Sequence, residues 1–513
     1  MKPVFWVAVL LVVLGAAVIR FRLLETPLER DEGEYAYAGQ LMLEGIPPYQ
    51  LAGNMKLPGT YAAYAVLMAA LGQTVAGIHV GLLLVNAAAI VLVALLGKRL
   101  FGTASGVAAC AAYALMSLGS EVMGALAHSE HFAVLASLGG AVLLLRFSDS
   151  GRLTTLWSSG LLFGLAFLMK QPGIFFGALG VLYVAAANRR GLRTLPGKWM
   201  VFGAGLAAPF IVTCGLLWHA GVFEKFWFWT FTYARAYASE VSLAEGSERF
   251  AELFPPILKQ NAALWILAAA GLARSWWTKA YRPSAALATA LLVFSFLAVC
   301  PGLYFRGHYF ILLLPAVAVL AGAAVDKMPS YAVFGGALLV SLFMQRDFLF
   351  RMSPVEASRE LYERNPFPEA IPVASYIRAH SAKDARIAIL GSEPEIYFYA
   401  HRHSATSYIY MYPLMETQPY ALTMQEDMIR EITAAAPEFV VDVGGDMSWL
   451  RDDESPTRIF EWWSGYGPQH YRMVGVADIL SAGHTEYRWD AAAEGYRPQS
   501  DSYLAVYRRD DTR

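Results

Sequence analysis

The chain has 513 residues, of which 57% are hydrophobic and only 16% are charged. Soluble domains carry about 25% charged residues, so this composition excludes a disordered chain and argues against an ordinary soluble enzyme. The formal net charge of −1 provides no electrostatic field for nucleic acid. All three cysteines lie in apolar runs, which indicates neither a disulfide framework nor a cysteine metal site.

Charged residues are distributed unevenly along the chain. They make up about 11% of residues 1–346 and about 25% of residues 347–513. Because lipid excludes charge and water does not, the first region is predicted to be an α-helical transmembrane domain and the second an aqueous domain. We expect the boundary at residue 346.

Apolar segments of helical length follow one another through the first region. A bilayer requires about 20 apolar residues for each helix, and fewer where a helix is packed inside protein. We predict eleven membrane helices at residues 4–20, 76–97, 104–120, 130–146, 155–170, 173–187, 199–219, 260–275, 285–304, 308–325 and 330–346. The chain is therefore expected to be a multi-pass membrane protein.

The short loops predict the orientation of these helices. Basic residues such as Lys98, Arg99, Arg146, Arg152 and Lys327 all fall on one side, and loops rich in lysine and arginine face the cytoplasm. The N-terminus is then cytoplasmic. An odd number of spans places residues 347–513 outside, and the resemblance described below favours the cytoplasmic (inner) membrane of a bacterium.

The C-terminal region reads as a small α/β domain. Strand-like runs at residues 387–390, 439–443, 473–477 and 504–507 alternate with helical stretches such as 417–435. The region is too polar to lie in lipid, so we expect an extracytoplasmic α/β domain.

The first exterior segment, residues 21–75, is more than a linker. It carries four acids, Glu29, Asp31, Glu32 and Glu34, ahead of an amphipathic run that is typical of a helix on the membrane surface. Residues 59–71 predict a second interfacial helix. The acids by themselves are also compatible with a solvated membrane edge, because carboxylates favour helix N-termini.

Further ionisable residues fall on the same exterior side. They are Lys56 beside a proline, Glu130 at a helix start, Lys170 in an apolar hairpin, and Arg306 close to His308. Ionisable groups at membrane depth are costly and usually face a functional cavity. Lys170 also fits a snorkelling interfacial lysine. The aromatic run at residues 226–233 fits either an interfacial belt or a lid over a lipid chain.

Taken together, these elements resemble a known superfamily. The sequence resembles the polyprenyl-phosphate-sugar-dependent membrane glycosyltransferases of the GT-C fold, especially the bacterial enzymes similar to protein O-mannosyltransferases and, more distantly, the lipid A aminoarabinose transferases. The resemblance covers about residues 1–346. The matching elements are Asp31-Glu32-x-x-Tyr35, Lys56-x-Pro58-Gly59, Ser129-Glu130-His131-Phe132, the turn from Leu168 to Gly173, and Arg306-x-His308-Tyr309-Phe310.

The resemblance implies transfer of a hexosyl or pentosyl group from a polyprenyl-phosphate donor to a glycan, lipid or protein acceptor at the extracytoplasmic face, with inversion. It makes Asp31 the candidate catalytic base, and Glu32 a supporting, acceptor-orienting or solvated residue. The donor phosphate is assigned to Lys56, Lys170 and Arg306, because cations stabilise phosphate oxygens. The substrate-binding candidates are Tyr35, Glu130, His308 and Tyr309.

The sequence does not supply a clear set of metal ligands. His128, Glu130 and His131 lie close enough along the chain to raise the question of a divalent metal. Met55 stands where the aminoarabinose transferase has a metal-binding glutamate, and Glu34 where that enzyme has an arginine. No metal is therefore assigned, and no other cofactor is predicted.

A transporter or lipid-linked sugar flippase is the alternative function. Eleven helices and buried charges also fit that class. We find no convincing internal repeat, however, and the charges gather at one boundary and not at the midplane. A binding module on an inert anchor is disfavoured because an anchor does not need so many helices.

Overall fold

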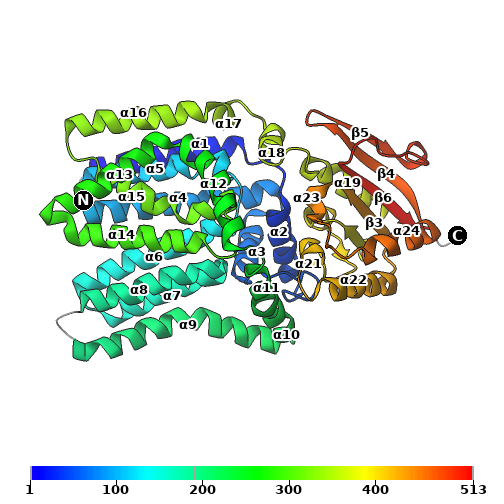
Figure 1. Cartoon of the computed structure of the whole chain (residues 1–513), viewed down its shortest axis with the longest axis horizontal. Coiled ribbons are helices and arrows are strands. Elements are labelled where there is room, and N and C mark those ends of the chain that lie inside the picture. Colours follow the sequence, from blue (N-terminus) through cyan, green and yellow to red (C-terminus); the bar gives the residue numbers. More distant parts are fainter. Residues whose placement is uncertain (1–2, 189–191, 511–513) are drawn as a thin grey trace.

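A computed structural model of the chain describes residues 3–188 and 192–510. It consists of a bundle of apolar helices joined end to end with a smaller α/β domain (Figure 1). The fold class expected from the sequence is confirmed.

Each of the eleven predicted membrane segments contains an apolar helix. Five helical runs among the described residues are long and apolar enough to cross a membrane: α1, α4, α6, α9 and residues 279–299. The others are shorter, so the number of spans remains a prediction. The bounds are α1 (Pro3–Arg22), α4 (Val75–Phe101), α5 (Thr103–Met116), α6 (Ser129–Ser150), α7 (Leu153–Met169), α8 (Ile174–Ala187), α9 (Leu195–His219), α13 (Ala262–Trp277), α14 (Arg282–Val299), α15 (Leu314–Ala323) and α16 (Met328–Met344).

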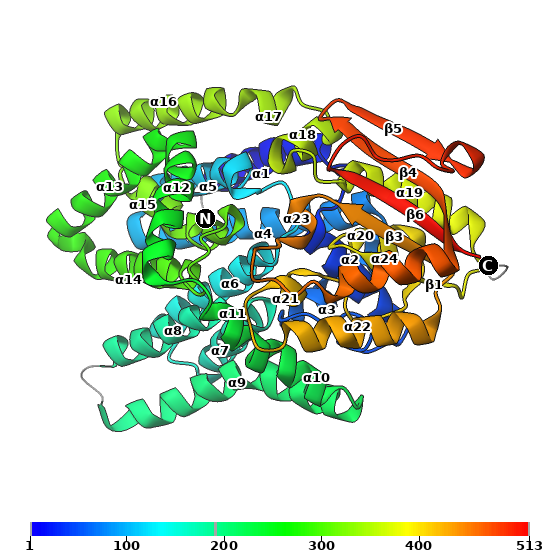
Figure 2. The ribbon, with the colours of Figure 1, turned by 45° about the vertical axis from the view of Figure 1, so that its right-hand side comes forward.

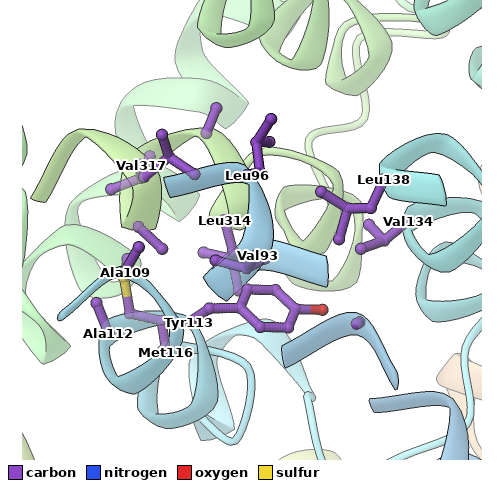
Figure 3. Close-up of a cluster of buried hydrophobic side chains, with 14 of the residues drawn as sticks. Val93, Leu96, Ala109, Ala112, Tyr113, Met116, Val134, Leu138, Leu314 and Val317 are labelled. Atoms are coloured by element: carbon purple, nitrogen blue, oxygen red, sulfur yellow. The ribbon is translucent and has the colours of Figure 1, made fainter. Parts of the chain in front are cut away.

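The segment at 308–325 differs from the single long helix that was predicted. It forms a short 3₁₀ helix, η6 (Gly307–Leu312), followed by the ten-residue α15, in which every residue is buried. Figure 3 shows Leu314 and Val317 packed close to side chains of α4 and α5, including Val93 and Tyr113. Because protein and not lipid surrounds α15, it is apolar on all faces although it is short.

The exterior segments are more helical than expected. The segment between the predicted membrane helices 199–219 and 260–275 contains α10 (Phe223–Trp227), the π-helix η4 (Phe228–Tyr233), α11 (Ala234–Ala238) and α12 (Leu243–Gln260). Ser242 caps α12 in a capping box with Glu245, a local signal that the sequence carries. The short 3₁₀ helices are η1 (Ser120–Val122), η2 (Gln171–Gly173), η3 (Leu192–Thr194) and η5 (Lys279–Tyr281).

Residues 21–75 form α2 (Arg30–Leu43) and α3 (Gly59–Leu71), and α3 has the bounds that the sequence predicted. The expectation that α2 lies on the membrane surface is wrong, because residues 30–41 are all buried. This helix packs against α3 and against α20 (Glu395–Ala400) of the C-terminal domain. Its polar positions therefore face protein and not water.

The C-terminal domain is built on one six-stranded mixed sheet with the order β2-β1-β3-β6-β4-β5. Strand β1 is parallel to β2 and β3, and the remaining pairs are antiparallel. The strands are β1 (Arg386–Leu390), β2 (His403–Ser404), β3 (Phe439–Gly444), β4 (Tyr471–Ser481), β5 (His484–Trp489) and β6 (Tyr503–Arg509). All four predicted strands are present; β2 and β5 were not predicted, because β2 is only two residues long and β5 has no buried face.

Short helices connect and cover this sheet. They are α17 (Arg346–Phe350), α18 (Pro354–Tyr362), α19 (Phe367–His380), α21 (Tyr412–Met415), α22 (Ala421–Ala435), α23 (Asp446–Trp449), α24 (Arg458–His470) and η7 (Asp490–Ala492). In Figures 1 and 2 the sheet lies at the right, and α21 lies between it and the helical bundle.

The two parts are joined by specific polar contacts. The Arg30 guanidinium lies 3.0 Å from the Glu393 carboxylate and donates a 2.6 Å hydrogen bond to the Ser392 carbonyl. The Gly53 amide donates a 2.8 Å hydrogen bond to the Ser407 carbonyl. The C-terminal domain thus packs directly on the exterior segment that carries the predicted site.

Candidate active site

A cavity of about 180 Å³ lies where the helical bundle meets the C-terminal domain. Seven of the nine candidate residues line it. They are Asp31, Tyr35, Lys56, Lys170, Arg306, His308 and Tyr309. The other two, Glu32 and Glu130, do not line the cavity and are described with their own contacts below.

The start of α2 positions Asp31. Glu29 accepts a 2.9 Å hydrogen bond from the Glu32 amide, and the Glu32 side chain completes a capping box. Asp31 is therefore in the first helical turn, where the N-terminal end of the helix dipole favours a carboxylate. The carboxylate accepts a 2.6 Å hydrogen bond from the Lys56 ammonium.

Lys56 bridges two acids. Its Nζ lies 2.6 Å from Asp31 Oδ1 and 2.9 Å from Glu34 Oε2, and it lies 4.7 Å from the centre of the Tyr35 ring. Glu34 also accepts hydrogen bonds from the Tyr61 hydroxyl and, at 2.6 Å, from the Asn54 amide. Glu34 is therefore not a solvated acid: its carboxylate is buried and hydrogen-bonded, and it holds the Lys56 ammonium in place.

The charges set the ionisation of this pair. Burial by itself raises the pKa of Asp31, but the Lys56 ammonium outweighs burial and holds that pKa well below its ordinary value. Burial lowers the pKa of Lys56, and the attraction of Asp31 and Glu34 reverses this and raises it well above the ordinary value. Asp31 is therefore ionised and Lys56 charged at neutral pH.

A second carboxylate–ammonium pair lies on the other side of the cavity. Lys170, at the turn after α7, donates a hydrogen bond to the buried Glu130 carboxylate at the start of α6. Its Nζ lies 4.0 Å from the centre of the Tyr309 ring, and His308 Nε2 lies 3.9 Å from Glu130. Lys170 is thus fixed inside the protein, and the snorkelling alternative does not describe it.

Arg306 differs from these two lysines. Lys56 and Lys170 each lie at ion-pair distance from a carboxylate, whereas no carboxylate within residues 3–188 and 192–510 lies at that distance from Arg306. Its guanidinium lies over the rings of Tyr304 and Tyr412, at 5.5 and 5.9 Å from their centres. Such a cation is available to an anionic ligand.

Glu32 does not line the cavity. Its carboxylate accepts a 2.5 Å hydrogen bond from the Ala127 amide and lies 3.0 Å from His79 Nε2. The side chain is fully buried. These bonds tie α2 to α4 and to the segment before α6, so Glu32 positions the helix that carries Asp31 and is not in contact with the cavity.

The C-terminal domain contributes lining residues that the sequence reading missed. The Tyr410 hydroxyl donates a 3.3 Å hydrogen bond to Asp31, and Tyr412 and Glu416 also line the cavity. Glu416 accepts a hydrogen bond from the Tyr233 hydroxyl of η4. Burial raises the pKa of Glu416 to about 7. The alternating tyrosines at 408, 410 and 412 are the signal in the sequence from which this contribution might have been inferred.

Three residues are arranged so that they can hold a divalent metal. Asp31, His128 and His308 each offer one ligand atom, and these atoms lie within 4.8 Å of one another. Both ring nitrogens of His128 and Nδ1 of His308 are buried without a hydrogen-bond partner. Imidazole and carboxylate suit Zn²⁺ and similar ions. This set differs from the His128, Glu130 and His131 cluster considered from the sequence, because Glu130 is engaged by Lys170.

Comparisons with known proteins agree with this architecture. The family model described as dolichyl-phosphate-mannose-protein mannosyltransferase matches residues 57–218. The apo structure of ArnT from Cupriavidus metallidurans is similar over 99% of this chain and 98% of that chain, with a TM-score of 0.61 and 14% identity. The same protein bound to undecaprenyl phosphate gives a TM-score of 0.57 over 98% of this chain and 97% of that chain, also at 14% identity.

A more distant similarity extends to the archaeal oligosaccharyltransferase AglB from Archaeoglobus fulgidus in complex with an inhibitory peptide and a dolichol-phosphate. It has a TM-score of 0.51 and 12% identity, and covers 94% of this chain and 74% of that chain. No curated protein matches the sequence. The fold is therefore that of the GT-C membrane glycosyltransferases. The resemblance inferred from the motifs is confirmed at the level of the fold and by the mannosyltransferase family model.

Proposed function

We propose that this protein is a glycosyltransferase that moves a sugar from a polyprenyl-phosphate donor to an acceptor at the extracytoplasmic face of a bacterial cytoplasmic membrane. One observation carries the proposal: the ionised Asp31–Lys56 pair lines the same cavity as the Arg306 guanidinium, which has no carboxylate partner among the described residues. A buried acid–base pair beside a free cation suits the displacement of a phosphate by a hydroxyl or amine.

The lining of the cavity includes groups that suit each half of such a donor. Apolar lining residues, among them Ala234, Ala238, Ala298 and Val299, come from α11 and the end of α14 and suit a prenyl chain. Arg306 lies on the same lining and suits the phosphate, because a guanidinium offers several donors to phosphate oxygens. The similarity to ArnT bound to undecaprenyl phosphate supports this arrangement.

The reaction that we propose is a single displacement. The acceptor oxygen or nitrogen forms a bond to the anomeric carbon, and the bond from that carbon to the phosphate oxygen breaks with its electron pair remaining on the phosphate. The acceptor proton passes to Asp31. Attack opposite the leaving group inverts the anomeric configuration.

The low pKa of Asp31 fits a late proton transfer. The ionised carboxylate first accepts a hydrogen bond from the acceptor, and takes the proton as bond formation makes the acceptor acidic. A phosphate that binds beside Lys56 shares the ammonium charge with Asp31, and this raises the basicity of the carboxylate. Lys56, Lys170 and Arg306 then stabilise the leaving phosphate, while Tyr35, His308 and Tyr309 shape the sugar site.

The orientation in the membrane is part of the proposal. Figure 1 shows the junctions between α13 and α14 and between α15 and α16 at the end of the bundle opposite the C-terminal domain. These junctions carry Arg274, Lys279, Arg282 and Lys327. A cytoplasmic location of that end, which follows from the positive charge, places the cavity and residues 347–513 outside.

The test uses the purified full chain in lipid nanodiscs with undecaprenyl-phosphate-linked mannose, glucose or aminoarabinose and a cell-envelope fraction as acceptor. We expect sugar transfer with release of undecaprenyl phosphate. Asp31→Asn should lower the rate by about 10²- to 10⁴-fold, the usual contribution of a general base, and Glu426→Gln on the exposed face of α22 should not. Full activity of a folded Asp31→Asn variant would overturn the site assignment.

The alternative function is decided by a second measurement. Reconstituted vesicles that move a lipid-linked sugar across the bilayer, without forming a new glycosidic bond, would favour the transporter or flippase. The same nanodisc preparation should then release no undecaprenyl phosphate from any donor.

A further inference from the structure

A second hollow is lined in part by segments that also line the active-site cavity. It is a groove of about 400 Å³ between α10 and η4 of the helical bundle and α22 of the C-terminal domain. Figures 1 and 2 both show α10 and α22 on the same side of the molecule. Small-molecule sites usually have volumes of about 300–1,000 Å³, and the volume of this groove falls in that range.

Aromatic side chains form much of the groove. Phe228, Trp229, Tyr408 and Tyr420 come from both parts of the protein. The ring centres of Phe228 and Tyr420 are 5.2 Å apart in an edge-on arrangement, and those of Trp229 and Tyr408 are 6.0 Å apart. Phe228 and Tyr420 remain partly exposed. Rigid rings of this kind provide an apolar contact surface at a low entropy cost.

The polar groups of the groove are mainly acidic. Glu224, Asp427 and Glu431 line it, with Lys225 as the lining cation. Glu431 is fixed by hydrogen bonds of 2.6 Å from the Thr406 hydroxyl and 2.8 Å from the Ser407 amide. Asp427 is paired with Arg430 at 2.6 Å, so the three lining carboxylates exceed the two nearby cations, Lys225 and Arg430, by one charge. This small excess disfavours a phosphate or an anionic lipid headgroup. It suits a neutral ligand that has hydroxyl donors.

The same two segments of the chain, η4 and residues 408–412, line both the groove and the cavity. On η4, Trp229 lines the groove and Tyr233 lines the cavity, with ring centres 5.3 Å apart. In the C-terminal domain, Tyr408 lines the groove and Tyr410 lines the cavity. A ligand in the groove is therefore close to the residues that contact a ligand in the cavity.

We propose that this groove binds a neutral carbohydrate, as the part of a glycan acceptor that lies next to the reacting residue. Aromatic rings pack against the apolar faces of sugar rings, and fixed carboxylates accept hydrogen bonds from sugar hydroxyls. The position beside the cavity then makes the acceptor of the proposed transferase a glycan. Its role as an acceptor site rests on the proposed function, whereas carbohydrate binding does not.

The experiment measures binding apart from transfer. The full chain in nanodiscs is titrated with neutral mannose and glucose oligosaccharides of one to six residues, and binding is followed by saturation-transfer NMR. Tyr420→Ala and Asp427→Asn should each weaken binding by about 10-fold or more. Their matched controls, Tyr487→Ala on exposed β5 and Glu426→Gln on α22, should leave it unchanged.

Transfer measurements on the same variants separate the two proposals. Asp31→Asn should lower the transfer rate by about 10²- to 10⁴-fold and retain oligosaccharide binding. Tyr420→Ala should raise the acceptor KM and leave the donor KM unchanged. Carbohydrate binding that depends on Tyr420 without any sugar transfer would keep the groove assignment and reject the transferase. Transfer with an unchanged acceptor KM in Tyr420→Ala would reject the groove.

Two further results would overturn the inference. The first is the absence of saturable oligosaccharide binding by the wild-type chain. The second is binding of a lysine-rich peptide that is lost in Asp427→Asn while oligosaccharides do not bind, because the acidic groove would then be a peptide site.

Discussion

Replacement of Arg306 with methionine separates phosphate recognition from folding. Arg306 has no carboxylate partner among the described residues, and its guanidinium lies over Tyr304 and Tyr412. Loss of these two ring contacts costs about 1–2 kcal/mol of stability, and methionine keeps part of the apolar stem. The unfolding temperature should therefore change little, in contrast to the removal of an ion-paired residue.

The effect on activity should be much larger. One charged hydrogen bond to a phosphate contributes about 1.5–3 kcal/mol, so Arg306→Met should lower kcat/KM for the lipid-phosphate donor by about 10- to 150-fold. Arg306→Lys should recover part of this loss. Arg249→Met is the matched control, because Arg249 lies 4.9 Å from the same Tyr304 ring but does not line the cavity.

The assay combines initial rates at varied donor concentration with direct binding of undecaprenyl phosphate to the nanodisc preparation. Two results would refute the reasoning. Unchanged donor binding in Arg306→Met would show that Arg306 does not contact the phosphate, and an equal loss in Arg249→Met would show that the effect passes through Tyr304.

Three further predictions follow from packing and charge. Lys56→Met should lower the free energy of unfolding by about 3–5 kcal/mol, because the two buried carboxylates that it bridges lose their counter-charge; a loss below about 1 kcal/mol in denaturant titrations would contradict this. Burial raises the pKa of Glu416 from 4.5 to about 7, so ionisation of this group destabilises the folded state as the pH rises through this range. At pH 8, Glu416→Gln should therefore be more stable than the wild type by at most about 3 kcal/mol, and at pH 4.5 the two should be equally stable. A difference in unfolding temperature between the two proteins that does not change with pH would reject this prediction. A Cβ at Gly33 would lie 2.6 Å from the Glu395 amide nitrogen, so Gly33→Ala should cost about 1–3 kcal/mol in thermal unfolding, whereas Gly15→Ala, with no atom within 4 Å, should cost nothing.

Much of the fold could be predicted because hydropathy is a local property. Each run of apolar residues has to leave water whatever lies beside it, so the eleven helical segments and four of the strands can be read directly from the chain. The division of residues 308–325 into η6 and α15 and the burial of α2 could not be predicted in this way. Both depend on neighbouring helices that replace lipid or water around those segments.

Several residues of the candidate site could likewise be predicted from the sequence, but the contacts between them could not. Asp31, Lys56 and Arg306 stand out in the sequence because charges in apolar surroundings are rare. Which of them are paired depends on distances: Lys56 contacts two carboxylates, whereas Arg306 contacts none among residues 3–188 and 192–510. The sequence assigned the phosphate to Lys56, Lys170 and Arg306, and the geometry favours Arg306.

The sequence by itself determined that the chain forms apolar helices followed by an α/β domain, and that acids and cations lie in the segments between the apolar helices. Only the tertiary structure decided that Tyr410 and Glu416 line the cavity together with Asp31, which is more than 370 positions earlier than either residue. Local patterns determine which solvent a segment prefers. Contacts between distant segments depend on how complete helices and sheets pack, and no short stretch of sequence encodes that packing.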